Sequence, residues 1–345
     1  MRSAKFNPST VLLVTGDLAI DESVFYFIGR QPCNDTLFLL MKRGSRPQIF
    51  VSELEYGNYC KMEDVAVRKL NRQAIESELK SVRGLIGINF SRVSLSQLQR
   101  LKKYTKARFV DISGEIGERR AIKSGEEIKK IRSACRITQE IFDSVPDMLA
   151  KSRTEQELAL HMELAARRCG TNLAFPVIVA SGRSSSIPHY EPQNKKIASG
   201  FLIVDFGVKF EGYCSDMTRT FFIGHPGEQH ENIFSCVMKA KAAAETLCVA
   251  GTLASGIHLA AEDIIFNELK QKMMHSIGHG LGLLTHDFPQ GLYAGAKFKL
   301  KENMVVTIEP GYYGKEGGVR VEDDVVVKKK KCLHLSRAPK DLVRL

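Results

Sequence analysis

The chain of 345 residues carries 50 Lys and Arg against 39 Asp and Glu, a formal charge of +11, and 43% of its residues are hydrophobic. This composition is ordinary for a globular protein with large cores and excludes a disordered chain. The longest apolar runs, at residues 11–14 and 36–41, fall far short of the roughly 20 residues that span a bilayer. Residues 1–10 are polar and precede no apolar stretch with a cleavage site, so we expect a cytoplasmic protein without a signal peptide.

The eight cysteines are scattered singly, without a C-x-x-C pair. This spacing favours reduced structural thiols over a zinc ribbon or a thioredoxin-like motif. The positive charge could attract nucleic acid or acidic partners. The dense basic run at residues 328–331 lacks interleaved aromatic residues, however, and charge runs usually face water, so we expect a solvated edge and neither nucleic acid nor membrane as a partner.

The first hundred residues mix strand-like and helical patterns. We expect strands at 11–16, 24–29, 36–41 and 47–52, and helices at 71–82 and 95–104. This mixture predicts one α/β domain. A polar, glycine-containing segment follows it at 111–127, and we place the boundary there, giving domains 1–118 and 119–345.

Two capping-box signals open helices in the second half of the chain. Ser124 with Glu127, and Thr154 with Glu157, have the spacing in which the two side chains cap each other's backbone N–H groups. The second helix should stop at Gly170. Further strands or hairpins are expected at 175–182, 200–224, 304–313 and 317–327, and helices at 232–251 and 255–272. This order predicts an α+β domain with helices grouped between hairpins.

Two hairpins, far apart in sequence, each carry a pair of acids. In the first, "VDFGVKFEGYCSDMTRT", a turn centred on Phe210 and Glu211 would place Asp205 directly opposite Asp216. Side chains in such a pair have Cβ atoms about 5 Å apart, which is a bridging distance for a cation.

The second hairpin, "IEPGYYGKEGGVRVED", gives the same result. A turn centred on residues 315–316 pairs Glu309 with Glu322, although Pro310 weakens the ladder there. Opposed like charges destabilise a sheet unless something neutralises them, so two such pairs indicate a metal. The alternative, solvent-facing turn residues, fits poorly with the apolar neighbours, because an unpaired buried carboxylate is costly.

Three histidines, His275, His279 and His286, lie in the glycine-rich segment "HSIGHGLGLLTHD". The first two have the spacing of a zinc helix, but the glycines and the missing acid argue against a helix. In an extended segment His275 and His279 share a face. A lone histidine is usually structural, whereas three beside a carboxylate cluster favour a metal site.

These motifs, "VDFG" with the second aspartate, "HSIGHGLGLLTHD", "IEPGYY" and "GVRVED", together resemble those of the pita-bread dinuclear metallopeptidases, which include methionine aminopeptidase, prolidase and aminopeptidase P. The linker "RAIKSGEEIKKIRSA" and the α/β domain before it are similar to the creatinase-like N-terminal domain of prolidases and aminopeptidases P. The resemblance implies a pita-bread α+β catalytic domain, preceded by a smaller α/β creatinase-like domain, in a homodimer.

The resemblance also implies the metal ligands. Asp205, Asp216 and Glu322 would hold one divalent ion, and Asp216, His279, Glu309 and Glu322 the other, so that Asp216 and Glu322 bridge. Oxygen ligation with a single imidazole suits Mn²⁺, and Co²⁺ or Zn²⁺ can occupy similar sets.

Further roles follow from the same resemblance. Glu309 would also shuttle a proton, His286 would stabilise the oxyanion, His189 would contact the substrate, and His275 would line the pocket. Two residues would brace the first aspartate from outside the ligand set: Tyr313 and Arg320.

The implied activity is hydrolysis of the bond preceding proline in dipeptides or short peptides, by a dipeptidase or an aminopeptidase. Many prolidase-like relatives carry a glutamate after the last histidine and a basic residue shortly beyond, whereas this chain has Asp287 and Gln290, which weakens the strict dipeptidase interpretation. Metal-free creatinase-like C–N hydrolysis is disfavoured because the acidic ligands are retained. A non-catalytic peptide- or nucleic-acid-binding protein on the same scaffold is the other alternative.

Overall fold

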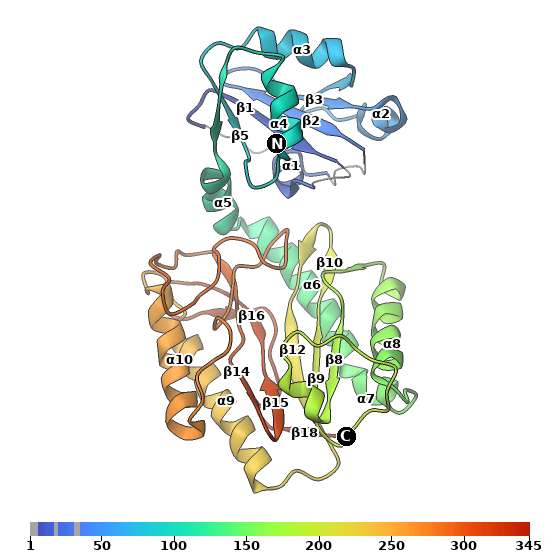
Figure 1. The fold of residues 1–345 in the computed structure, drawn as a ribbon, viewed down its shortest axis with the longest axis vertical. Coiled ribbons are helices and arrows are strands. Elements are labelled where there is room, and N and C mark those ends of the chain that lie inside the picture. The colour runs from blue at the N-terminus through green and yellow to red at the C-terminus, as the bar shows by residue number, and fades with distance from the viewer. Residues whose placement is uncertain (1–5, 17–19, 31–34) are drawn as a thin grey trace. The chain divides into compact units, whose positions relative to one another are not determined.

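The chain forms two compact units, Met1–Arg120 and Ala121–Leu345. The computed structural model describes residues 6–16, 20–30 and 35–345 (Figure 1). The first five residues, on which the expectation about a signal peptide partly rests, lie outside the described residues. The boundary expected at 118/119 lies inside helix α5 (Ser113–Ala121).

The first unit is built on a six-stranded mixed sheet in the order β4-β3-β2-β1-β5-β6. Its strands are β1 (Thr10–Thr15), β2 (Leu37–Lys42), β3 (Gln48–Val51), β4 (Ala66–Lys69), β5 (Leu85–Ile88) and β6 (Arg108–Asp111). The helices that precede α5 are α1 (Glu22–Ile28), α2 (Glu53–Tyr59), α3 (Arg72–Lys80) and α4 (Leu95–Lys102). The central strand β1 runs antiparallel to β2 and parallel to β5.

Alternate residues of β1 enter two separate cores, because successive side chains of a strand point to opposite faces of the sheet. Val11 and Leu13 pack in one core with side chains of α1 and α2. Leu12 and Val14 pack in the other with side chains of α3 and α4. A strand that is buried on both faces is a continuous apolar run, as its sequence is.

One expected strand of this unit is wrong. The strand expected at 24–29 is instead part of α1, with Gly29 as the C-cap of that helix. The helix begins after Asp21, whose side chain accepts a hydrogen bond from the Ser23 N–H, and it ends at Gly29, which has a φ of 71°. Capping at both ends and burial of one helix face outweigh the β propensity of these residues. The other strands and helices predicted in this unit are confirmed.

The second unit places its strands between two groups of helices (Figure 1). Helices α6 (Gly125–Asp143), α7 (Val145–Leu149) and α8 (Glu155–Arg168) form one group, and α9 (Glu228–Leu247) and α10 (Ala254–Leu269) form the other. The predicted α+β arrangement, with helices grouped between hairpins, is confirmed.

The strands of this unit form four small sheets. One has the order β18 (Val343–Arg344), β12 (Met217–Ile223), β9 (Gly200–Phe206), β8 (Ile178–Ser181). Another has the order β13 (Val305–Ile308), β16 (Asp323–Val326), β17 (Leu333–His334). The remaining two are β11 (Tyr213–Cys214), β10 (Val208–Phe210), β7 (Asn172–Leu173), and the hairpin β14 (Gly311–Gly314), β15 (Gly317–Arg320).

Both predicted capping signals operate in the second unit. At the start of α6, Ser124 and Glu127 make both hydrogen bonds of the capping box. At the start of α8, Thr154 accepts from the Glu157 N–H, but the Glu157 carboxylate accepts from the Arg153 N–H instead of closing the box. The chain leaves α8 through Gly170, whose φ is 71°.

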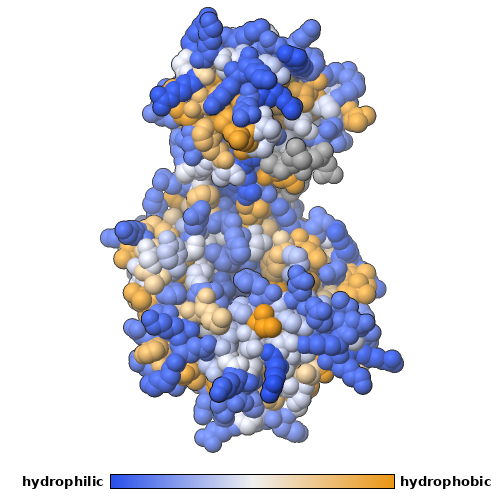
Figure 2. Space-filling model, viewed as in Figure 1, coloured by the Kyte–Doolittle hydropathy of each residue, from blue (hydrophilic) through white to orange (hydrophobic). Residues whose placement is uncertain are grey.

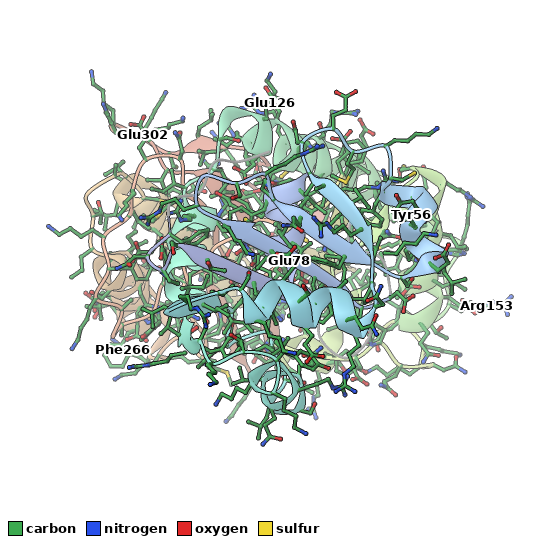
Figure 3. All side chains as sticks on the ribbon, turned by 90° about the horizontal axis from the view of Figure 1, so that it is seen from above. Tyr56, Glu78, Glu126, Arg153, Phe266 and Glu302 are labelled. Carbon is green, nitrogen blue, oxygen red and sulfur yellow. The ribbon has the colours of Figure 1, made fainter. Side chains whose placement is uncertain are left out.

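No helix within residues 6–16, 20–30 and 35–345 combines the length and the apolar character that crossing a membrane requires. The face drawn in Figure 2 is mostly hydrophilic, with apolar side chains scattered singly or in small groups. Charged side chains such as Glu126, Arg153 and Glu302 project outward in Figure 3. Residues 329–331 of the basic run are exposed, as expected for a solvated edge.

The capping box of α6 gives a stability prediction. Replacing Ser124 with alanine removes the acceptor of the Glu127 N–H and should lower the free energy of unfolding by about 1 kcal/mol, measured by urea denaturation followed by circular dichroism. Ser133→Ala, inside the same helix, is the matched control and should stay within about 0.5 kcal/mol of the parent. Equal losses in the two variants would contradict the capping role.

Candidate metal centre

The first acidic hairpin has a register that differs from the one expected. Asp205 on β9 pairs with Thr218 on β12, not with Asp216. The turn is centred on Glu211 and Gly212, which have φ angles of 46° and 86°, one residue later than expected. A two-residue turn with two positive φ angles matches the twist of a hairpin, and Gly212 supplies one of them without strain. Asp216 still shares a face with Asp205, because it lies two residues from Thr218, so the two acids are diagonal neighbours.

The second acidic hairpin has the predicted register. Ile308 on β13 pairs with Asp323 on β16, and the same register continues through β14 and β15 to a turn centred on residues 315–316. Glu309 therefore falls opposite Glu322, as the spacing predicts. The two hairpins bring two pairs of carboxylates together from segments that are far apart in the sequence of the second unit.

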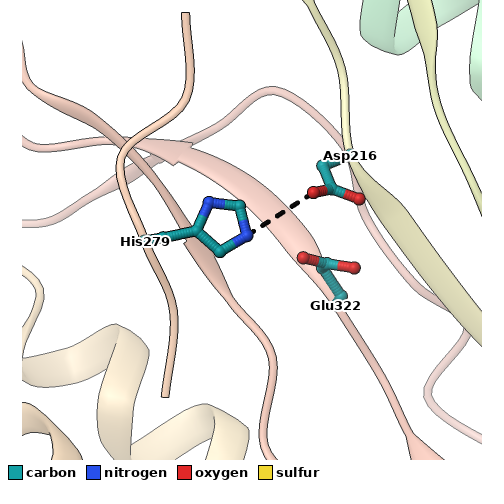
Figure 4. A group of neighbouring side chains, drawn as sticks. All are labelled: Asp216, His279 and Glu322. Carbon is teal, nitrogen blue, oxygen red and sulfur yellow. Dashed lines mark ion pairs between the residues drawn. The ribbon is translucent and has the colours of Figure 1, made fainter. Parts of the chain in front are cut away.

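Three side chains from separate segments point toward one another at this place (Figure 4). Asp216, His279 and Glu322 are buried, and each offers a ligand atom within 4.8 Å of the other two. The His279 Nε2 atom lies 3.5 Å from Asp216 Oδ2 and 3.4 Å from Glu309 Oε1. The segment that carries His279 is a loop, not a helix, as the glycines predict.

Asp205 is held by one of its two carboxylate oxygens. Arg320 Nη2 donates to Asp205 Oδ2 at 2.7 Å. The other oxygen, Asp205 Oδ1, is buried and accepts no hydrogen bond from any described residue. A buried carboxylate oxygen without a partner is costly, so this atom is suited to a ligand that the chain itself does not supply.

The acids of the cluster carry more negative charge than the chain neutralises. Burial, together with neighbouring carboxylates, holds the pKa values of Asp216 and Glu322 well above their usual range. Burial also raises the pKa of Glu309 to about 8. A divalent cation would reverse these shifts, because a nearby positive charge favours the ionised form. Several carboxylates with one imidazole are a suitable donor set for such a cation.

The imidazole of His279 is neutral and has a defined tautomer. Burial, followed by the charge of His286, lowers the pKa of His279 to about 3. Its Nδ1 lies 3.2 Å from the carbonyl oxygen of Gly280, which can only accept, so Nδ1 carries the proton. Nε2 is therefore left with a lone pair that faces Asp216 and Glu309, which is the state a metal ligand requires.

Arg320, Tyr313 and His275 form a continuous hydrogen-bonded chain behind Asp205. Arg320 Nη1 donates to the Tyr313 hydroxyl at 2.7 Å, and that hydroxyl lies 2.8 Å from His275 Nε2. His275 Nδ1 donates to the carbonyl of Ser276 at 2.8 Å, so the Tyr313 hydroxyl must donate to Nε2. Burial lowers the pKa of His275 to about 4 and keeps it neutral. Both ring nitrogens are thus occupied, so His275 can meet a substrate only through its ring carbons.

His286 and His189 lie at the exposed side of the cluster. The ring centroids of His279 and His286 are 4.2 Å apart. Burial, and after it the nearby His189, lowers the pKa of His286. His189 is also close enough to Asp205 to act on the pKa of that acid. The structure therefore brings all the predicted site residues into one neighbourhood.

Two threonines that the sequence analysis missed connect the acids to the rest of the site. Thr218 Oγ1 donates to Glu322 Oε2 at 2.7 Å and accepts from Arg320 Nε at 3.1 Å. Thr307 Oγ1 accepts from the His279 N–H at 3.0 Å and donates to Glu309 Oε1 at 3.3 Å. Each lies two residues from a predicted ligand, on the same side of its strand, so the period of two could have identified both.

The segment 322–324 uses three consecutive acids on alternating sides. Asp324 points to the same side as Glu322, and its Oδ2 accepts from the Asp216 N–H at 3.0 Å. Asp323 points to the opposite side, where it lies 3.0 Å from Arg219 Nη2 and 2.7 Å from Lys241 Nζ. Although burial acts to raise it, these two cations lower the pKa of Asp323 to about 2.

A second cluster of possible metal ligands lies on that opposite side and consists of Glu245, Asp323 and His334. The Lys241 ammonium lies among them, in contact with both acids. The chain therefore supplies its own cation here, which separates this cluster from the one around Asp216.

The sequence matches two known protein families. Residues 129–329 match metallopeptidase family M24, and residues 9–122 match the creatinase/prolidase N-terminal domain. A Xaa-Pro dipeptidase of Pyrococcus horikoshii is 31% identical to this chain over 333 residues, which are 94% of this chain and 93% of that protein.

Solved structures give the same result. An X-Pro aminopeptidase from Thermotoga maritima has a TM-score of 0.89 at 28% identity, covering 98% of this chain and 97% of that chain. A Xaa-Pro dipeptidase from Bacillus anthracis has the same TM-score of 0.89 and identity of 28%, covering 98% and 95%. These similarities confirm the predicted fold, a pita-bread catalytic domain preceded by a creatinase-like domain. The chain belongs to metallopeptidase family M24.

Proposed function

We propose that this chain is a metal-dependent peptidase that hydrolyses the bond preceding proline in dipeptides or short peptides. The relatives support this substrate, since they are named Xaa-Pro dipeptidase and X-Pro aminopeptidase. The observation that carries the proposal is the convergence of buried Asp216, His279 and Glu322, within ligand distance of one another, in a site whose acids lack enough cationic partners.

The cofactor in this proposal is a pair of divalent ions, Mn²⁺ or Co²⁺, with Zn²⁺ as a further candidate. The proposed ligands are Asp205, Asp216 and Glu322 for one ion, and Asp216, His279, Glu309 and Glu322 for the other. When bound, such a pair polarises the scissile carbonyl and lowers the pKa of water from 15.7 to about 7. The partnerless Asp205 Oδ1 and the neutral His279 Nε2 support this set.

The side chains around these ligands have separate proposed tasks. Glu309 would hold and release a proton at Oε2, because Oε1 already accepts from Thr307. His286 would donate an N–H to the oxyanion, and His189 would contact the substrate. His275 would contribute a wall of the pocket, supported by its saturated ring nitrogens. Tyr313 and Arg320 would brace Asp205.

The preference for proline needs a dedicated pocket. An X-Pro bond has no amide hydrogen, and the ring fixes φ near −65°, so general peptidases bind it poorly. Dipeptidase and aminopeptidase relatives are equally similar to this chain in structure. A peptide assay is therefore the way to distinguish the two specificities.

We also propose that the chain acts as a cytoplasmic homodimer, with residues 1–118 as the creatinase-like domain and 119–345 as the catalytic domain. The family resemblance supports both the dimer and the assignment of catalysis to the second domain. The singly spaced cysteines support a reducing compartment.

The proposed function predicts a specific substrate profile. With added Mn²⁺ or Co²⁺, the purified chain should release proline from Ala-Pro if it is a dipeptidase, or alanine from Ala-Pro-Ala if it is an aminopeptidase. Asp216→Asn should lower kcat/KM by more than about 100-fold, because it weakens both ion sites. Asp263→Asn, on the exposed face of α10, is the matched control. Inactivity of the parent chain on both peptides would contradict the function.

Thr218 provides a test of ligand bracing. Thr218→Val keeps the shape of the side chain but removes the donor to Glu322 and the acceptor of Arg320. Metal affinity should fall by about 10–100-fold, measured by calorimetric titration of metal-free protein with Mn²⁺. Thr246→Val is the control, since that hydroxyl bonds only a helix carbonyl among the described residues. Unchanged affinity in Thr218→Val would remove the bracing role.

The raised pKa values predict a pH dependence for the metal-free protein. Asp216, Glu322 and Glu309 hold protons in the fold that the unfolded chain has already lost, with the pKa of Glu309 at about 8. This stabilising contribution is complete below the unfolded pKa of about 4 and is lost as pH rises through the folded values. Histidines with lowered pKa values act in the opposite direction, but only below about pH 6.5.

Between about pH 7 and pH 8, therefore, the free energy of unfolding of metal-free protein should fall by about 1.4 kcal/mol per pH unit for each carboxyl that stays protonated. Urea denaturation at closely spaced pH values measures this slope. Glu309→Gln should make the slope shallower, and saturating Mn²⁺ should reverse it because ion binding requires ionised carboxylates. A flat profile in metal-free protein would show that these acids are already ionised.

A further inference from the structure

Lys123 is a buried lysine in the linker "RAIKSGEE" that the proposed chemistry does not use. It is 2% exposed, and lysines are almost never buried so completely without a partner. Its N–H donates to the Asn303 carbonyl at 2.9 Å, which fixes its backbone beside the 301–304 turn. Its Nζ donates to the Phe288 carbonyl at 2.9 Å. The side chain thus reaches from the start of the second unit to the end of the loop that follows His279.

That loop is closed by hydrogen bonds around Asp287. Asp287 Oδ2 accepts from the Leu283 N–H at 2.9 Å, and Oδ1 accepts from the Phe288 N–H at 2.8 Å. The Asp287 N–H donates to the Gly280 carbonyl at 2.8 Å. His286 is the residue immediately before Asp287, so its backbone lies between these anchoring points.

Gly282 shows how closely Lys123 and Asp287 pack against this loop. A Cβ atom at Gly282 would lie 2.6 Å from Asp287 Oδ2 and 3.4 Å from Lys123 Cε. A larger side chain at position 282 would therefore have to displace the Asp287 carboxylate. The same loop contacts the Asp216 hairpin, since the Cys214 N–H donates to the Gly282 carbonyl at 2.8 Å.

We propose that Lys123 is a positioning residue: by holding the Phe288 carbonyl beside Asp287, it fixes the loop that presents His286 next to His279. A lysine suits this task, because its long stem can be buried while a compact cationic donor reaches a carbonyl. In a buried environment such a bond is strong, and its loss leaves the carbonyl unsatisfied. The inference rests on the proposed function for its catalytic consequence, but the loop anchor is a separate structural claim.

The test compares Lys123→Met with Lys129→Met in metal-loaded enzyme. Lys129 is exposed on α6, where it forms an ion pair with the equally exposed Glu126, so this control should behave as the parent chain. Lys123→Met should lower kcat for the cleaved Xaa-Pro peptide by about 10–100-fold, since a displacement of about 1 Å can cost 100-fold. KM and the affinity for Mn²⁺ should stay unchanged, because this loop segment supplies no proposed ligand after His279.

Hydrogen exchange measured by mass spectrometry gives a readout that does not depend on activity. Lys123→Met should speed exchange in peptides covering 280–290 and leave peptides covering 205–220 and 318–324 unchanged. Lys123→Arg, which keeps a cationic donor, should restore part of the protection. Three results in Lys123→Met would each overturn the proposal: faster hydrogen exchange throughout the chain, a loss of Mn²⁺ affinity as large as the loss of kcat, or an unchanged kcat.

Asp287→Asn covers the case in which Lys123→Met does not fold. It weakens the same loop from its other side and should likewise lower kcat while KM stays unchanged. Faster hydrogen exchange should be confined to residues 280–290. Unchanged exchange in this variant would overturn the anchor. If the parent chain cleaves no Xaa-Pro peptide, the proposed function fails, while the exchange pattern still decides whether Lys123 anchors the loop.

Discussion

The burial of like charges is the constraint on which the second unit depends. Asp216 and Glu322 are enclosed with other carboxylates, and burial keeps their pKa values high. Asp323, adjacent in sequence to Glu322, is equally buried but ionised, because Arg219 and Lys241 lie against it. Asp323 is therefore neutralised by the chain's own cations. The acids on the opposite side of the segment have too little positive charge around them, which suits a cation from solution.

Helix α6 makes hydrogen bonds that help to position these acids. Glu127 closes the capping box with Oε2 and accepts from the Tyr213 hydroxyl with Oε1 at 2.9 Å. Further along the same helix, the Cys135 thiol donates to Asp324 Oδ2 at 3.2 Å. This oxygen also accepts from the Asp216 N–H. The helix that this capping box begins is thus hydrogen-bonded to the Asp216 hairpin at Tyr213 and, through Asp324, is connected to the Asp216 N–H.

The sequence predicted the elements and acids that depend on local periodicity and turn chemistry. The capping box of α6, the Thr154 cap of α8 and the Glu309–Glu322 register were found because their signals are local. The first hairpin was misplaced by one residue, since a turn with two left-handed residues at 211–212 competes with the one assumed. Helix α1 was missed because helix capping by Asp21 outweighs the β propensity of residues 24–28. Contacts such as Lys123 with Phe288 join segments 165 residues apart, and no local pattern encodes them.

The alternation in residues 322–324 has a consequence for folding fidelity. A strand that slips by one residue exchanges its two faces completely. Such a slip would turn Glu322 toward Arg219 and Lys241, and would bring Asp323 to the acidic side while its former cations faced a different acid. Only the native alignment both pairs Asp323 with Arg219 and Lys241 and places Glu322 and Asp324 beside Asp216, so the same three acids that prepare the site also distinguish one alignment of the strands.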